Sequence, residues 1–126
     1  MEKILIISDH IWEDVINVIL TDDINATIKH NAEVNNFNPD KYLTDHADAV
    51  CLDIEEPGFN SCALIFDISK INVGRIVHET NHLTYNILDK RDVPLNDETM
   101  EVYAYTQTWL FNKVYDFWVE FEKNKV

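Results

Sequence analysis

The chain has 126 residues, of which 46% are apolar, and its formal net charge at pH 7 is −13. This length suits one substantial hydrophobic core, so we expect a single domain over residues 1–126. The negative charge opposes binding to nucleic-acid phosphates or anionic membranes, which leaves a neutral or basic partner. No apolar run reaches the length of a membrane span, and residues 4–7 are interrupted too early for a signal-peptide core, so a cytoplasmic location is expected.

The first third of the chain predicts strands followed by a helix. Residues 3–7 are β-branched and apolar, which indicates a strand. Residues 11–20 fit either a helical face or a buried strand, and we favour the strand. The segment Thr21-Asp22-Asp23 offers N-cap side chains for a helix with apolar residues at 24, 28 and 32 that ends near residue 35.

A β-hairpin is predicted in the middle of the chain. Residues 49–55 alternate as a half-buried strand, residues 56–58 form a turn, and residues 61–68 return as a second apolar strand. Cys51 and Cys62 lie on this hairpin. Because no export signal is present, reduced and buried thiols are expected rather than a disulfide.

Two helices are predicted in the last part of the chain. Ser69 or Asn72 can cap the first, which extends to about residue 90, and Asn96 can cap the second. The second helix carries two neighbouring apolar stripes, formed by Tyr103, Leu110, Val114, Phe117 and Phe121 and by Phe111, Tyr115 and Trp118. Core packing explains most of them. A homodimer seam is the alternative, because two stripes exceed what one helix usually buries in a small domain.

The segment from Ile76 to His82 contains the pattern His-Glu-x-x-His. On a helix, His78 and His82 stand one turn apart on one face and can direct two imidazole nitrogens at one ion. Glu79 lies about 100° round the helix axis, where its carboxylate can reach a metal-held water without being a ligand. This spacing predicts a hydrolytic zinc site. Because a catalytic zinc commonly has three protein ligands, a third ligand is expected elsewhere in the chain.

A second motif lies downstream, in the segment Glu101-Val102-Tyr103-Ala104-Tyr105. The interval from His82 to Glu101 and the Glu-x-x-Ala pattern resemble the gluzincin group of metallopeptidases. The likeness spans roughly residues 60–106 and is closest to small, single-domain metallopeptidase-like proteins of bacteriophages. It implies that Glu101 is the third zinc ligand, with Glu98 and Asp97 in reserve. Tyr105 stands where several gluzincins have an acidic residue that orients a zinc-binding histidine.

The resemblance also implies a fold and a mode of substrate binding. It implies an α+β, minimal zincin-like domain, with a small, mainly antiparallel sheet packed on the active-site helix and a long C-terminal helix. In the proteins that this chain resembles, an edge strand beside that helix pairs with extended substrate, and residues 63–67 have the matching chain order. The alternative is that these residues form an ordinary core strand.

The expected reaction is hydrolysis of a peptide or protein substrate. Zinc held by His78, His82 and Glu101 lowers the pKa of its water, and Glu79 takes the proton as that water attacks the carbonyl. Hydroxyl groups that can stabilise the oxyanion are, in order of preference, those of Tyr105, Tyr103 and Tyr85.

A second function from a different class also fits the composition. An acidic protein can act as a non-catalytic binder, either as a DNA-mimicking decoy or with a zinc ion that only locks two helices together. This alternative predicts a closed metal site or no metal, whereas a peptidase requires an open coordination position.

Overall fold

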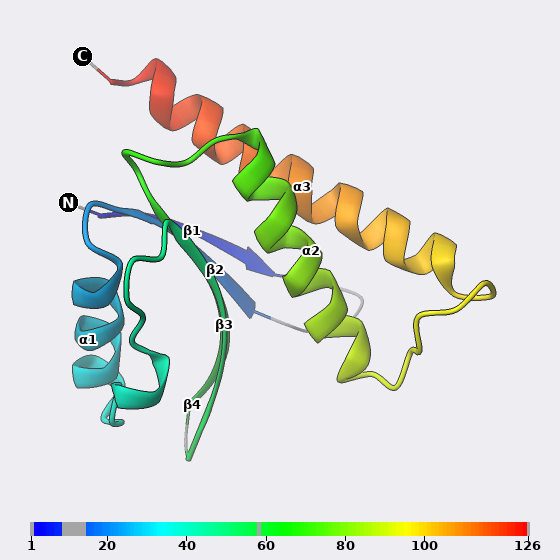
Figure 1. Ribbon diagram of the computed structural model, residues 1–126, viewed down its shortest axis with the longest axis horizontal. Coiled ribbons are helices and arrows are strands. Elements are labelled where there is room, and N and C mark those ends of the chain that lie inside the picture. The colour runs from blue at the N-terminus through cyan, green and yellow to red at the C-terminus, as the bar shows by residue number, and fades with distance from the viewer. Residues whose placement is uncertain (1, 9–14, 58, 126) are drawn as a thin grey trace. The chain divides into compact units, whose positions relative to one another are not determined.

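The computed structural model describes residues 2–8, 15–57 and 59–125 (Figure 1). Their strands and α-helices are β1 (Glu2–Ser8), β2 (Val15–Thr21), α1 (Ile24–Asn35), β3 (Ala49–Glu56), β4 (Phe59–Asp67), α2 (Val73–Asp89) and α3 (Met100–Lys123). The chain divides into two compact units, residues 1–71 with the sheet and α1, and residues 72–126 with α2 and α3. The predicted α+β class, with a mainly antiparallel sheet and a long C-terminal helix, is confirmed. The single domain stays a prediction.

The four strands form one sheet in the order β1-β2-β4-β3. β1 pairs with β2 antiparallel, β2 with β4 parallel, and β3 with β4 antiparallel. β4 is therefore an interior strand whose backbone is paired on both sides. The expectation that residues 63–67 form an edge strand for substrate is wrong, and their alternative as an ordinary core strand is the correct one. An interior strand has no unpaired backbone groups to offer to an extended peptide.

One face of the sheet packs against α1. The Asp23 carboxylate accepts a hydrogen bond from the Ala26 amide at 3.0 Å and caps the helix as predicted. Apolar residues at i, i+4 spacing then turn toward the sheet, and the core on this face consists of Ile19, Ile24, Ile28, Ala63 and Ile65. Burial of each large aliphatic side chain contributes about 1.5–3 kcal/mol before the entropy of ordering is subtracted.

Two ambiguities of the sequence are settled in this first unit. The favoured strand is confirmed from Val15 onward, while residues 11–14 lie outside the described residues. Ile16, Val18 and Leu20 are buried on one face of the sheet and Ile19 is buried on the other, and burial on both faces explains an apolar run rather than a strict alternation. Cys51 and Cys62 form no disulfide with each other; Cys62 is buried as predicted, whereas Cys51 is only half-buried.

In the second unit, α2 and α3 run antiparallel. Asn72 caps α2, since its side-chain oxygen accepts a hydrogen bond from the Arg75 amide at 2.9 Å. α3 begins at Met100, three residues later than a cap at Asn96 predicts. The Asn96 side chain instead accepts from the Glu98 and Thr99 amides at 2.9 and 3.1 Å, so it stabilises a turn before the helix. None of the described helices has the length and apolar character that a membrane crossing requires.

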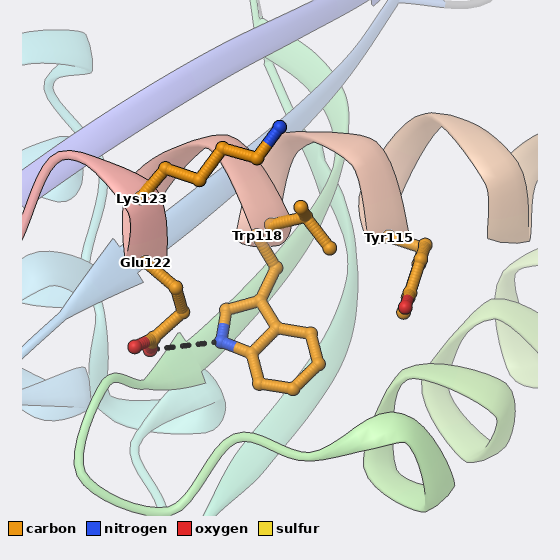
Figure 2. Close-up of a pocket in the computed structure, with 5 residues that line it drawn as sticks. Tyr115, Trp118, Glu122 and Lys123 are labelled. Atoms are coloured by element: carbon orange, nitrogen blue, oxygen red, sulfur yellow. Dashed lines mark hydrogen bonds between the residues drawn. The ribbon is translucent and has the colours of Figure 1, made fainter.

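The C-terminal half of α3 carries a row of aromatic side chains that is only half-buried. Phe111 stacks on Tyr115 with ring centroids 5.5 Å apart, and Tyr115 meets Trp118 edge-on at 6.1 Å. Trp118 donates a hydrogen bond to Glu122 at 3.1 Å, beside a shallow hollow of about 370 Å³ (Figure 2). The fully buried members of the predicted stripes are Leu110 and Val114. The homodimer seam on this helix stays a prediction.

A buried polar contact fixes α2 against α3. The Gln107 side-chain amide donates to the Thr80 hydroxyl at 2.7 Å, and its oxygen accepts from the Thr84 hydroxyl at 3.1 Å. Both threonines are buried on α2. The Thr80 hydroxyl also donates to the Ile76 carbonyl at 2.7 Å. The Thr84 hydroxyl shares its single proton between Gln107 and the Thr80 carbonyl, which lies at 2.8 Å, so each hydroxyl keeps one partner if Gln107 is lost.

Replacing Gln107 with leucine should lower the free energy of unfolding by about 1–2 kcal/mol, because two buried hydroxyls lose a partner. Urea denaturation followed by circular dichroism measures the change. Asn112→Leu, at an exposed position of the same helix, is the matched control and should change the stability by less than half as much. Equal losses in the two variants would mean that the contact between the helices contributes nothing specific.

Candidate metal centre

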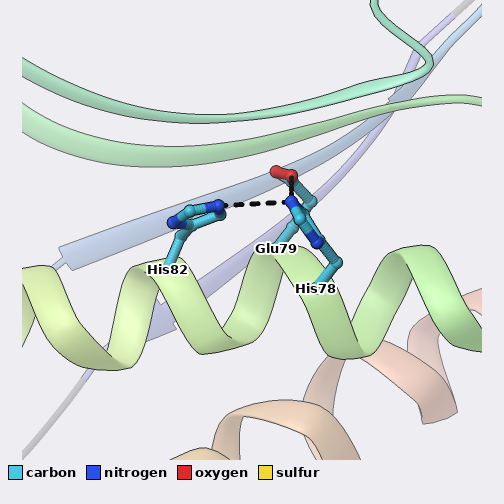
Figure 3. Close-up of side chains that lie close together, drawn as sticks. All are labelled: His78, Glu79 and His82. Carbon is cyan, nitrogen blue, oxygen red and sulfur yellow. Dashed lines mark hydrogen bonds and ion pairs between the residues drawn. The ribbon is translucent and has the colours of Figure 1, made fainter.

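The His-Glu-x-x-His pattern lies in the middle of α2, where the helix is regular on both sides. The i, i+4 spacing places the two imidazole rings side by side, with His78 Nε2 and His82 Nε2 3.2 Å apart (Figure 3). The rings meet edge-on with centroids 4.8 Å apart. Both histidines are exposed, and the His78 side chain retains 68% of its accessible surface. The two nitrogens are therefore accessible to an ion.

The separation of the two nitrogens matches a tetrahedral metal site. Two nitrogens that each lie 2.0–2.1 Å from a tetrahedral zinc are about 3.3–3.4 Å apart. The 3.2 Å between His78 Nε2 and His82 Nε2 is within about 0.2 Å of that value. Without metal, one imidazole N–H can donate to the other ring at the same distance. Side-chain rearrangement on metal binding would thus be small.

Glu79 differs from its two neighbours because it is buried. Its side chain is 8% exposed, and its Oε1 lies 3.7 Å from His78 Nε2. Its other oxygen, Oε2, is buried and has no hydrogen-bond partner in the described part of the chain. Burial raises the pKa of this carboxyl group, an effect that the two histidines partly offset. A carboxylate with an unsatisfied buried oxygen is costly, and such exceptions often mark functional groups.

His78, Glu79 and His82 form the only group of metal-ligating side chains that converges among the described residues, with ligand atoms within 4.8 Å of one another. This group can hold a metal ion. The structure brings the three residues of the first motif together, and no acid from another described element joins them.

Glu101 does not join the two histidines. It is exposed in the first turn of α3, whereas Gln107, not Glu101, contacts α2 near Thr80. Glu101 precedes Gln107 by six residues and so lies about 9 Å from it along the axis of α3. Because the helices are antiparallel, this displacement places Glu101 beyond the level of His82. The histidines and α3 also lie on opposite sides of α2 (Figure 3). The predicted ligand role of Glu101 is therefore not supported, and Glu98 and Asp97, exposed before α3 begins, offer no replacement.

Two of the three tyrosines expected to assist the reaction, Tyr105 and Tyr103, are separate from the histidines. Tyr105 is 73% exposed and lies two residues before Gln107, so it points away from α2. Tyr103 donates a hydrogen bond to the Val93 carbonyl at 2.7 Å and so holds the connection between the helices. Burial raises its pKa, with smaller contributions from Tyr85 and Asp89. Tyr85, half-exposed and three residues after His82, is the one tyrosine on the histidine side of α2.

Comparisons of this chain with protein families, curated proteins and solved structures find no match. The gluzincin resemblance is thus supported only by the His78-Glu79-x-x-His82 group itself. The case for a metal centre depends on the geometry of these side chains.

Sequence reasoning missed two features of the site. The first is the depth of Glu79, whose carboxylate is the most buried charge of the motif. The second is the contact of Thr80 and Thr84 with Gln107, which fixes the opposite face of the same helix turns. Threonines at i, i+4 spacing within a motif helix are the signal that could have indicated this contact.

Proposed function

We propose that this protein is a zinc-dependent metallopeptidase in which His78 and His82 hold the metal and Glu79 is the general base. One observation carries the proposal. Two exposed imidazole nitrogens lie 3.2 Å apart beside a buried carboxylate whose second oxygen has no hydrogen-bond partner among the described residues. Neutral imidazole and carboxylate are the donor groups that zinc sites of this class use, and a base is needed beside the attacking water.

Each of the three side chains has a distinct role in this mechanism. His78 and His82 present neutral imidazole nitrogens on one side of α2. When bound, zinc supplies a Lewis acid that makes water acidic near neutral pH and polarises the peptide carbonyl. Glu79 accepts a proton from the water as its oxygen bonds to the carbonyl carbon. The same carboxyl group then delivers that proton to the amine nitrogen as the C–N bond breaks.

The environment of Glu79 suits the role of a base. Its raised pKa brings the proton affinity closer to the value at which a carboxylate both accepts and releases a proton at neutral pH. Thr80 and Thr84, on the opposite face of the same helix turns, are hydrogen-bonded to Gln107. This contact fixes α2 and therefore holds the Glu79 carboxylate in place. Two protein ligands leave coordination positions for water and substrate.

The proposal is tested by metal analysis and by turnover of a peptide library. The protein loaded with one equivalent of zinc should cleave internal peptide bonds, and chelation by EDTA should abolish cleavage, with activity restored by zinc. Trace proteases are controlled for with His82→Ala protein purified in parallel. A wild-type protein that binds no zinc, or cleavage that survives in the His82→Ala preparation, would refute the assignment.

A non-catalytic acidic binding protein is the second candidate. The interior position of β4 favours it, because the strand expected to hold an extended substrate has no unpaired edge. The net charge of −13 points to a basic partner. In that case Glu79 would act as a third ligand of a structural ion, and glutamine at this position would lower metal affinity.

A further inference from the structure

β1 is an edge strand that contains no proline, no bulge and no charge in its centre. It pairs with β2 in continuous register, from Glu2↔Thr21 to Ser8↔Val15, and no other described strand pairs with its outer edge. Natural edge strands commonly carry a proline, a bulge, a central lysine or another inward-pointing charge that prevents further pairing. The only charged residues of β1, Glu2 and Lys3, stand at its beginning, and residues 4–7 are all aliphatic.

The face of this edge on the α1 side is apolar and exposed. Ile4 and Ile6 keep 55% and 63% of their accessible surface, and Val15, beside them on β2, keeps 52%. They share a face with Ile19, because Ile4 is its partner in the β1–β2 register. α1 covers Ile19 but leaves Ile4 and Ile6 exposed, and Ile4 lines an open cavity of about 230 Å³ beside α1. The three side chains form a patch of roughly 300 Å², a size that is often functional.

We infer that this edge pairs with the same edge of a second copy of the chain, antiparallel and about a two-fold axis near Leu5. When residues 2–8 of the two copies overlap completely in antiparallel orientation, Leu5 lies opposite Leu5 of the partner subunit. Ile4 then lies opposite Ile6 of the partner subunit, and the exposed apolar patches of the two copies become continuous. Glu2 lies opposite Ser8 of the partner subunit, so no like charges face each other across the pair.

A second copy fits this surface better than an unrelated extended peptide. The patch is self-complementary, because its isoleucines are spaced symmetrically about Leu5, and a two-fold interface requires such a surface. The two patches and the paired strands together bury on the order of 1,000 Å², which is at the lower limit for a specific interface. We therefore expect a reversible dimer with a dissociation constant on the order of micromolar to tens of micromolar.

The salt dependence of binding distinguishes a second copy of the chain from a basic partner. Each chain carries −13, so two copies repel each other, and salt that screens this repulsion should strengthen the dimer. A basic peptide bound to the acidic chain would instead be released by salt.

Sedimentation equilibrium over a range of protein concentrations, at 0.05 and 0.5 M sodium chloride, tests the inference on the full chain. Wild type should dimerise, and more tightly at the higher salt. Ile6→Lys should raise the dissociation constant at least 10-fold, and Ile6→Thr, which keeps a β-branched residue in the strand, should raise it several-fold. Val34→Lys, at a position on α1 that is 67% exposed, is the matched control and should dimerise as wild type does. Circular dichroism confirms folding of each variant.

Three results would overturn the inference. They are a wild-type chain that stays monomeric at millimolar concentration, a dimer unaffected by both Ile6 variants, or a dimer lost equally in Val34→Lys. If Trp109→Lys on α3 abolishes dimerisation while Ile6→Lys does not, the seam lies on the C-terminal helix instead. Hydrogen exchange gives a second readout, since alternate backbone amides of β1 should become protected at concentrations where the dimer forms.

Discussion

Glu79→Gln is expected to lower peptide hydrolysis by about 10²- to 10⁴-fold, the range for loss of a positioned general base. Glutamine has nearly the same shape as glutamate but cannot accept a proton at neutral pH. Because His78 and His82 are unchanged, the variant should still bind one equivalent of zinc. The measurements are steady-state turnover of a peptide cleaved by wild type and metal content after dialysis.

The same variant provides its own folding control. Within the part of the chain that the structure describes, one oxygen of the buried carboxylate has no partner, so a neutral side chain should raise the free energy of unfolding of metal-free protein by about 1 kcal/mol at pH 7. Urea denaturation in EDTA measures this gain. A more stable, zinc-loaded and inactive variant supports the base assignment. If zinc binding falls together with activity, Glu79 is a ligand, and the non-catalytic candidate gains support.

His82→Ala is expected to weaken zinc binding at least about 100-fold, since it removes one of the two imidazole nitrogens that converge. His78→Ala should have a similar effect. Competition titration with a chromogenic zinc chelator measures the affinities. His30→Ala, at an exposed position on α1, is the matched control for loss of a histidine and should bind zinc as tightly as wild type does.

Glu101→Gln tests whether Glu101 is a zinc ligand, as the downstream Glu-x-x-Ala motif predicts, or lies away from the metal, as in the structure. The structure places this carboxylate in solvent at the start of α3, so zinc affinity should be unchanged. A loss comparable to that of His82→Ala would show that α3 moves to bring Glu101 to the metal. In that event the resemblance to gluzincins would have identified the third ligand correctly.

Local patterns predicted most of the fold. The caps by Asp23 and Asn72, the strand before the first helix and the hairpin all depend on residues close in sequence, and the structure confirms them. The start of α3 was misplaced because Asn96 stabilises a turn with the same side-chain chemistry that caps a helix. The order of strands was missed, because the parallel pairing of β2 with β4 is a long-range contact.

The same difference between local and long-range contacts applies to the metal centre. Residues at i and i+4 of one helix must be neighbours, so the meeting of His78 and His82 follows from the sequence alone. The approach of Glu101 requires the relative rotation of two helices. Gln107, with its contacts to Thr80 and Thr84, sets that rotation and turns the opposite side of α2 toward α3. A spacing between motifs carries no information about this rotation.

An anomalous difference map at the zinc absorption edge, from a zinc-soaked crystal, shows whether His78 and His82 bind zinc together. We expect one strong peak about 2.0–2.1 Å from both His78 Nε2 and His82 Nε2, with Glu79 nearby but further away and Glu101 in solvent. A map with no peak between the two imidazole rings, while zinc binds elsewhere or not at all, would contradict joint zinc binding by the two histidines.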